Sequence, residues 1–160
     1  MLREIKLRLD KMDRKILSVL QVEGRITNVE LARRVGISAP PCLRRVRAME
    51  RAGIIKHFQA VVDDELLGFQ VTIFIMVNLD HRSEEEFQNF ESRAENWDIV
   101  RNCYRLTGEV DYLLKCVSSD LRTFQTFITD ELTIADNVTQ IRTLVTDRQT
   151  KQFNGVPFDD

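Results

Sequence analysis

In the first third of the chain, apolar residues recur at the three- and four-residue spacing of helices that bury one face. This pattern predicts three helices, at residues 10–23, 27–36 and 38–51. Gly36 lies at the junction of the second and third predicted helices, and two helices joined by a short glycine-containing turn are typical of a helix-turn-helix. The residues expected to form the common core are Met12, Ile16, Leu17, Val19, Leu20, Val29, Leu31, Ala32, Val35, Cys42, Leu43, Val46 and Met49.

The predicted helix starts differ in their capping residues. Thr27 and Glu30 have the spacing of a capping box for the second helix. Ser38 is placed to cap the third helix, but Pro40 and Pro41 lack the N–H groups that a capping side chain would accept. Either Ser38 is a weak cap, or its hydroxyl is free to bind another acceptor such as a phosphate.

The second half of the chain alternates between strand-like and helix-like segments. The expected strands are 69–79, 99–106, 110–117 and 138–147, and the expected helices begin near Ser83 and Ser119. Their order, βαββαβ, is the ferredoxin-like pattern. The residues expected to face inward from the two helices are Phe87, Phe90, Ala94, Leu121, Phe124, Ile128 and Leu132.

We therefore predict an α+β chain of two domains. Residues 1–62 form a winged helix-turn-helix, in which 54–62 is the strand after the third helix. Residues 63–68 form a hinge, 69–150 the ferredoxin-like domain, and 151–160 a C-terminal tail.

Both faces of the first strand in the ferredoxin-like domain are apolar. Its odd-numbered residues from Val71 to Leu79 point one way, yet Phe74 and Met76 on the other face are also large. Since the fold covers only one face of its sheet with helices, the second face needs a partner, and we expect a second copy of the same sheet. Such a homodimer would carry two recognition helices and would bind paired, pseudo-palindromic half-sites on double-stranded DNA.

The charges are divided unequally between the two halves. Residues 1–62 hold 14 Lys and Arg against 6 Asp and Glu, a net charge of +8, whereas 63–160 hold 9 against 19, a net charge of -10. The formal charge of -2 for the whole chain is therefore a cancellation. This asymmetry indicates that the N-terminal half binds a polyanion.

Arginines form a stripe on the third predicted helix. Arg44, Arg47 and Arg51 lie at i, i+3 and i+7, opposite the apolar face, and Arg45 flanks them. Arginine-rich helix faces are often only solvated, but this stripe lies on the second helix of a helix-turn-helix, which enters the major groove of DNA. We predict that Ser38 and these four arginines bind DNA.

Residue types that would support other functions are missing from the pattern. Cys42, Cys103 and Cys116 form no metal-like spacing with the two histidines, and an odd number of unpatterned cysteines suggests reduced thiols. No nucleophile has a placed base, and no glycine loop is arranged to hold a phosphate. The longest apolar run, 71–79, is too short to span a membrane. We expect a soluble, cytoplasmic, nucleoid-associated protein with no cofactor, metal or enzymatic activity.

Three stretches together resemble a known family. LDKMDRKILSVLQVEGRITNVELARRVGIS from residue 9, PPCLRRVRAMERAGII from residue 40 and LTGEVDYLLK from residue 106 are similar to the Lrp/AsnC family of feast/famine transcriptional regulators, over about residues 9–150. The resemblance implies a winged helix-turn-helix and a ferredoxin-like effector domain that forms dimers and often octamers. It also implies that an amino acid or related small molecule binds where effector domains of neighbouring dimers meet.

The resemblance places the effector near a loop of the form Gly-x-x-Asp-Tyr, which matches Gly108, Asp111 and Tyr112. Glu109 and Val110 lie in the variable part of this loop and leave the ligand open. An Asp here could accept a ligand's ammonium group, and backbone N–H groups could bind its carboxylate. Without the family, Gly108 is most simply a hairpin glycine and Tyr112 an inward-facing strand residue.

The sequence as a whole favours a DNA-binding transcriptional regulator controlled by an amino acid or related effector. A second interpretation is an architectural protein that binds DNA without sequence preference or effector. A third, less favoured, is a regulatory subunit of an amino-acid metabolic enzyme.

Overall fold

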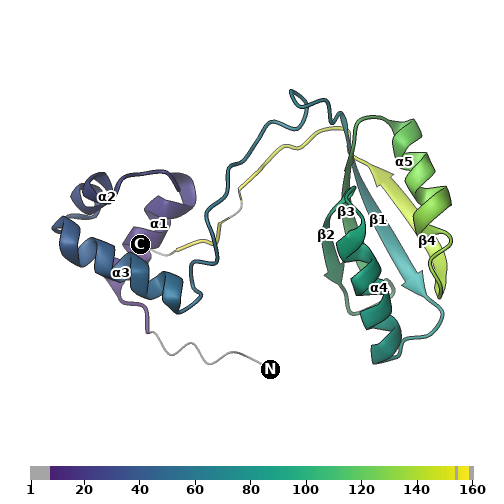
Figure 1. Cartoon of the computed structure of the whole chain (residues 1–160), viewed down its shortest axis with the longest axis horizontal. Helices are drawn as coiled ribbons and strands as arrows, with labels where there is room; N and C mark the ends of the chain where they lie inside the picture. The colour runs from purple at the N-terminus through teal and green to yellow at the C-terminus, as the bar shows by residue number, and fades with distance from the viewer. Residues whose placement is uncertain (1–7, 154, 159–160) are drawn as a thin grey trace. The chain divides into compact units, whose positions relative to one another are not determined.

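The computed structural model describes residues 8–153 and 155–158, and the chain divides into two compact units. One unit comprises Met1–Val61 with Lys151–Asp160, and the other comprises Val62–Thr150. In Figure 1 the first unit carries helices α1 to α3, and the second carries the sheet with α4 and α5.

The first unit is built from three helices. They are α1 (Lys11–Val22), α2 (Asn28–Val35) and α3 (Ala39–Arg51), close to the three predicted segments. Gly36 ends α2 in the left-handed conformation, with φ 82° and ψ 35°, which glycine adopts without the steric cost of a side chain. The buried core residues of this unit are Ile16, Leu17, Leu31, Ala32, Val35, Cys42 and Met49, all of them predicted.

Some of the sequence predictions for this unit are wrong. Val29 and Leu43, expected in the core, are 71% and 37% exposed, because each lies at the margin of its helix's apolar face. The predicted strand 54–62 is not a strand. Ile54 and Ile55 pack against the helical core, and the residues after them are exposed. A strand needs a neighbour for its backbone N–H and C=O groups, and none of the strands described here pairs with this segment.

The second unit contains a four-stranded antiparallel sheet and two helices. Its elements are β1 (Val71–Leu79), α4 (Glu84–Asn96), β2 (Val100–Arg105), β3 (Tyr112–Ser118), α5 (Leu121–Phe127), a π-helical turn (Ile128–Leu132) and β4 (Val138–Val145). The strand order is β2-β3-β1-β4, and every pair is antiparallel. This confirms the predicted ferredoxin-like βαββαβ fold.

Helices α4 and α5 lie on the same face of the sheet (Figure 1). The predicted core residues of α4, Phe87, Phe90 and Ala94, are buried. In α5 the prediction fails for Leu121, which is 52% exposed, while Phe127 is buried. Leu121 is the first residue of α5, and the buried face of this helix is formed by Phe124 and Phe127. In the π-helical turn that follows, the predicted Leu132 is buried and Ile128 packs against the core.

The other face of the sheet has no helix. Phe74 and Met76 lie on it, both partly exposed, as the alternation in β1 predicts. Phe74 is paired across the sheet with Lys115 of β3 and Leu144 of β4. We call the apolar residues of this surface the open sheet face; they are Phe74, Met76, Tyr104, Leu113, Val117 and Leu144.

Candidate DNA-binding and effector sites

Helix α3 presents one buried and one cationic face. Cys42 and Met49 are fully buried against α1 and α2, which fixes the rotation of the helix. Arg44, Arg47 and Arg51 are therefore exposed on the opposite side, as the spacing predicts. Within the described part of the chain, no carboxylate forms an ion pair with these three guanidinium groups. They are free to bind an external anion.

Arg45 has a different environment from the rest of the stripe. Its Nη1 donates hydrogen bonds to Asp13 Oδ1 at 2.7 Å and Asp10 Oδ2 at 2.8 Å, and Asp13 is buried. The hydrogen bond to Asp13, with the further bond to Asp10, raises the pKa of Arg45. Asp10 and Asp13 also form a reciprocal capping box at the start of α1. Arg45 thus fastens α3 to the first turn of α1.

The start of α3 is arranged as its prolines suggest. The side chain of Ser38 caps no N–H group, and Ser38 is exposed. Pro40 lies directly after the first residue of the helix, where the missing N–H has no intrahelical partner. Asn28 Nδ2 donates to the Ala39 carbonyl at 2.9 Å and so ties the start of α2 to the start of α3. The turn of the helix-turn-helix is held without using the Ser38 hydroxyl.

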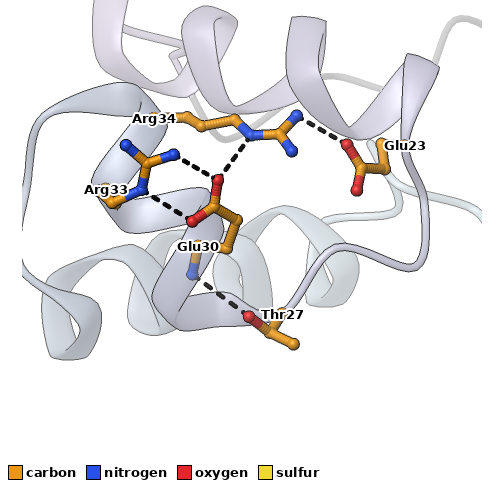
Figure 2. Close-up of polar contacts among 5 residues, drawn as sticks. All are labelled: Glu23, Thr27, Glu30, Arg33 and Arg34. Carbon is orange, nitrogen blue, oxygen red and sulfur yellow. Dashed lines mark hydrogen bonds and ion pairs between the residues drawn. The ribbon is translucent and has the colours of Figure 1, made fainter.

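Helix α2 carries an ion-pair network around Glu30 (Figure 2). Arg33 binds the Glu30 carboxylate through two hydrogen bonds, at 2.7 and 2.8 Å, and Arg34 Nε binds it at 3.0 Å. Arg34 also pairs with Glu23 at 2.6 Å, which joins α2 to the end of α1. Hydrogen bonds from Arg33 and then Arg34 lower the pKa of Glu30 to about 2.

This network changes the predicted capping box of α2. Thr27 Oγ1 accepts the Glu30 N–H at 3.3 Å, which is one half of the motif. The Glu30 carboxylate binds the two arginines, and no return bond to the Thr27 N–H is present among the described residues.

In the second unit, the predicted effector residues lie around the β2–β3 hairpin. Gly108, at the turn, has φ 132°, a conformation that residues other than glycine rarely adopt. Asp111 is only 5% exposed, and its Oδ2 accepts the Leu79 N–H at 2.9 Å. Its Oδ1 pairs with Arg82 Nε at 3.0 Å. The Asp111 carboxylate therefore already holds the loop to the end of β1, and Arg82 remains half exposed.

Tyr112 points away from this loop, toward α4. Its ring is fully buried and packs 4.5 Å from Phe90, centroid to centroid. Its hydroxyl donates to Glu91 Oε1 at 2.8 Å and lies 3.3 Å from the Phe87 carbonyl. Burial, with the hydrogen bond to Glu91, raises the pKa of Tyr112. Gly108 and Asp111 thus share the loop, whereas the Tyr112 side chain lies under the helix.

A hollow of about 490 Å³ lies between α4 and β2. Tyr112 forms part of its wall, but Gly108 and Asp111 do not. It carries both charge signs, and the charged residues that line it are Glu91, Glu95, Arg101 and Arg105. Arg105 is partly engaged, because its guanidinium pairs with Glu84 at 3.2 Å and lies 3.5 Å above the Phe87 ring.

Sequence reasoning missed several residues of these sites. Asp13 gave no signal, because its partner Arg45 is 32 positions away and neither helix predicts how the other is rotated. Arg82 and Glu91 were missed for the same reason, since their partners Asp111 and Tyr112 lie on another element. Within residues 8–153 and 155–158, no group of His, Cys, Asp or Glu could hold a metal, and no helix is long and apolar enough to cross a membrane.

A helix-turn-helix with an exposed arginine face, in one chain with a ferredoxin-like domain, defines the class of two-domain, DNA-binding transcriptional regulators. Two family models match the chain. One describes a winged helix-turn-helix DNA-binding domain, over residues 9–56, and the other the Lrp/AsnC ligand binding domain, over residues 72–156.

Similar proteins agree with both models. The leucine-responsive regulatory protein of Rhizobium meliloti is 48% identical, over 92% of this chain and 94% of its own length. The leucine-responsive regulatory protein of Escherichia coli K12 is 35% identical, over 91% of this chain and 89% of its own length. The crystal structure of a transcriptional regulator from Neisseria meningitidis, in complex with L-methionine, has a TM-score of 0.89 and 36% identity, covering 94% of this chain and 97% of its own. The chain belongs to the Lrp/AsnC family of transcriptional regulators.

Proposed function

We propose that this regulator binds specific, pseudo-palindromic DNA sites through α3. The observation that carries the proposal is the row formed by Arg44, Arg47 and Arg51, which is exposed and unpaired among the described residues. Arginine can donate two hydrogen bonds to guanine in the major groove or bind phosphate. Ser38 is exposed and its hydroxyl caps no N–H group, so it is placed to donate to a phosphate near the helix start. Arg45 contributes by holding α3 against α1, with part of its charge still accessible.

The regulator acts as a homodimer, with octamers as the larger assembly, in the cytoplasm on nucleoid DNA. The open sheet face supports the dimer, because it places six apolar side chains on a surface that no helix of its unit covers. Apolar patches of this kind favour burial against a partner, and a second copy supplies a matching one. Two copies present two α3 helices to half-sites about 10 bp apart or a multiple of that spacing.

The effector is an amino acid. Relatives are named for their response to leucine, and the Neisseria regulator was solved with L-methionine. In this chain Gly108 and the neighbouring backbone of the hairpin would bind the ligand's carboxylate together with the half-exposed Arg82. Asp111 contributes by orienting Arg82, because its two oxygens are engaged by Arg82 and by the Leu79 N–H. Tyr112 anchors the strand that follows the loop beneath α4, and the hollow there is the alternative place for the ligand.

Asp111→Asn tests the effector site. The amide oxygen can still accept the Leu79 N–H, so the loop is expected to keep its position, but the charge that orients Arg82 for the ligand is lost. In a thermal-shift assay with L-leucine and L-methionine, the wild type is expected to gain several degrees from its effector, and Asp111→Asn none.

Glu95→Gln, in the hollow but away from the hairpin, is the matched control and is expected to retain the shift if the ligand binds at the hairpin. An unchanged shift in Asp111→Asn, or loss of the shift only in Glu95→Gln, would move the site away from the loop.

A further inference from the structure

The described C-terminal residues 155–158 lie against α1 of the first unit. The Gln21 side chain makes two hydrogen bonds to the backbone of Val156: its Nε2 donates to the Val156 carbonyl at 3.2 Å, and its Oε1 accepts the Val156 N–H at 2.6 Å. This pairing satisfies both backbone groups of one tail residue, as a neighbouring strand would. It joins positions that are 135 residues apart in the sequence.

Phe158 provides a second attachment. It is partly buried and packs against the helical core of the first unit. It also lines a hollow of about 760 Å³, together with Leu9, Asp10, Lys11, Arg14, Lys15 and Ser18. Since Val156 is bound at Gln21 and Phe158 lies near the earlier residues of α1, the tail runs antiparallel to this helix.

Gly155 allows the close approach. A Cβ atom at this position would lie 2.6 Å from Gln21 Oε1 and 2.6 Å from the Phe153 ring. Both distances are far inside van der Waals contact, so a side chain here would push the tail or Gln21 aside. The contact therefore depends on the absence of a side chain at one residue and on a two-point hydrogen bond at the next.

Helix α1 is also the helix to which Arg45 fastens α3, through Asp13 and Asp10. The tail, α1 and the arginine-bearing helix thus form one continuous set of contacts within the first unit. The chain leaves the second unit after β4, which ends at Val145, and returns to this set of contacts at residue 155.

We propose that residues 155–158 form a strap that completes the DNA-binding unit and holds α1, and with it α3, in the binding orientation. The first unit is then attached to the second by two stretches of chain, the one that follows α3 and the one that follows β4. The effect on DNA binding rests on the proposed function, whereas the docking of the strap does not.

Gln21→Ala in the full-length chain tests the strap, with Val156→Ala as the matched control. The first removes both hydrogen bonds, and the second leaves both intact because they use only the Val156 backbone. In hydrogen-exchange mass spectrometry, amides of α1 are expected to exchange about fivefold faster in Gln21→Ala than in Val156→Ala. The helical circular-dichroism transition of the first unit is expected to fall by about 4 °C. Trp97 is the sole tryptophan of the sequence and lies in the second unit, so its fluorescence transition is expected to stay in place.

Gly155→Ala gives an independent test from the tail itself and is expected to reproduce the exchange result without altering α1. DNA affinity is expected to fall about threefold in Gln21→Ala and Gly155→Ala, equally for operator and random DNA, because fewer molecules hold α3 in the competent orientation.

Equal exchange of the α1 amides in Gln21→Ala, Gly155→Ala and Val156→Ala would overturn the docking. Faster exchange with unchanged affinity for all DNA would overturn the role of the strap in orienting α3. A protein that lacks sequence preference would instead contradict the proposed function, and the exchange result would still decide the docking.

Discussion

Replacing Arg47 with alanine is expected to weaken operator binding by about 1 to 3 kcal/mol, roughly 5- to 150-fold, and to relax the preference at one base pair. Arg47 lies at the middle of the exposed row on α3, opposite the buried Cys42 and Met49, so its loss leaves the helical core unchanged. The proposed two-bond contact of Arg47 with guanine would be lost. Fluorescence anisotropy on the operator and on each single-base variant measures both effects.

The salt dependence separates base contact from phosphate contact. If Arg47 binds only phosphate, affinity falls equally on all sequences, and the slope of log affinity against log salt becomes shallower by about one. Arg122→Ala removes the same charge from an exposed position of the second unit and is expected to leave affinity unchanged. If Arg47→Ala binds every DNA as tightly as the wild type, α3 is not the recognition helix.

Phe74→Lys is expected to convert the dimer into a monomer of 18.7 kDa at micromolar concentration. Phe74 lies on the open sheet face beside Lys115, so the substitution places two ammonium groups next to each other on a surface that the dimer buries. Burying an unpaired charge costs several kcal/mol, which exceeds what one dimer contact can offset. Loss of the dimer is expected to lower operator affinity by at least about tenfold, because a monomer binds one half-site where the dimer binds two linked half-sites. Analytical ultracentrifugation measures the mass.

Gln125→Lys adds the same charge on the exposed side of α5 and is expected to remain dimeric. The circular dichroism and Trp97 fluorescence of both variants are expected to match the wild type, which separates loss of the dimer from loss of the fold. A wild type that sediments as a monomer, or a dimeric Phe74→Lys, would remove the open sheet face as the dimer surface.

The helices and the sheet could be predicted from sequence because their determinants are local. The helix periodicity identified the buried faces of α1, α2 and α3, and alternation in β1 separated the core side from the open sheet face. Where the determinant is not local, the prediction was wrong. The segment 54–62 alternates like a strand but lacks a neighbouring strand, and Leu121, the first residue of α5, is exposed although it has helical spacing to the buried Phe124.

The sequence was sufficient to predict which types of residue line the candidate sites, but not which residues form hydrogen bonds and ion pairs with one another. The spacing of Arg44, Arg47 and Arg51 was sufficient to place them on one exposed face. The same reasoning could not distinguish Arg45, because its partners Asp10 and Asp13 come from another helix. The strap was equally hidden, since residues 155–158 have no periodicity and their contacts with α1 arise only in the folded chain.

The arginine face of α3 is proposed to recognise a DNA sequence. The most direct test of this recognition is the affinity of the wild-type protein for an operator selected from random DNA, compared with a scrambled duplex of the same length at the same salt concentration. We expect the operator to bind at least about 10³-fold more tightly. A ratio near one would contradict the claim and would indicate an architectural protein that binds DNA without sequence preference.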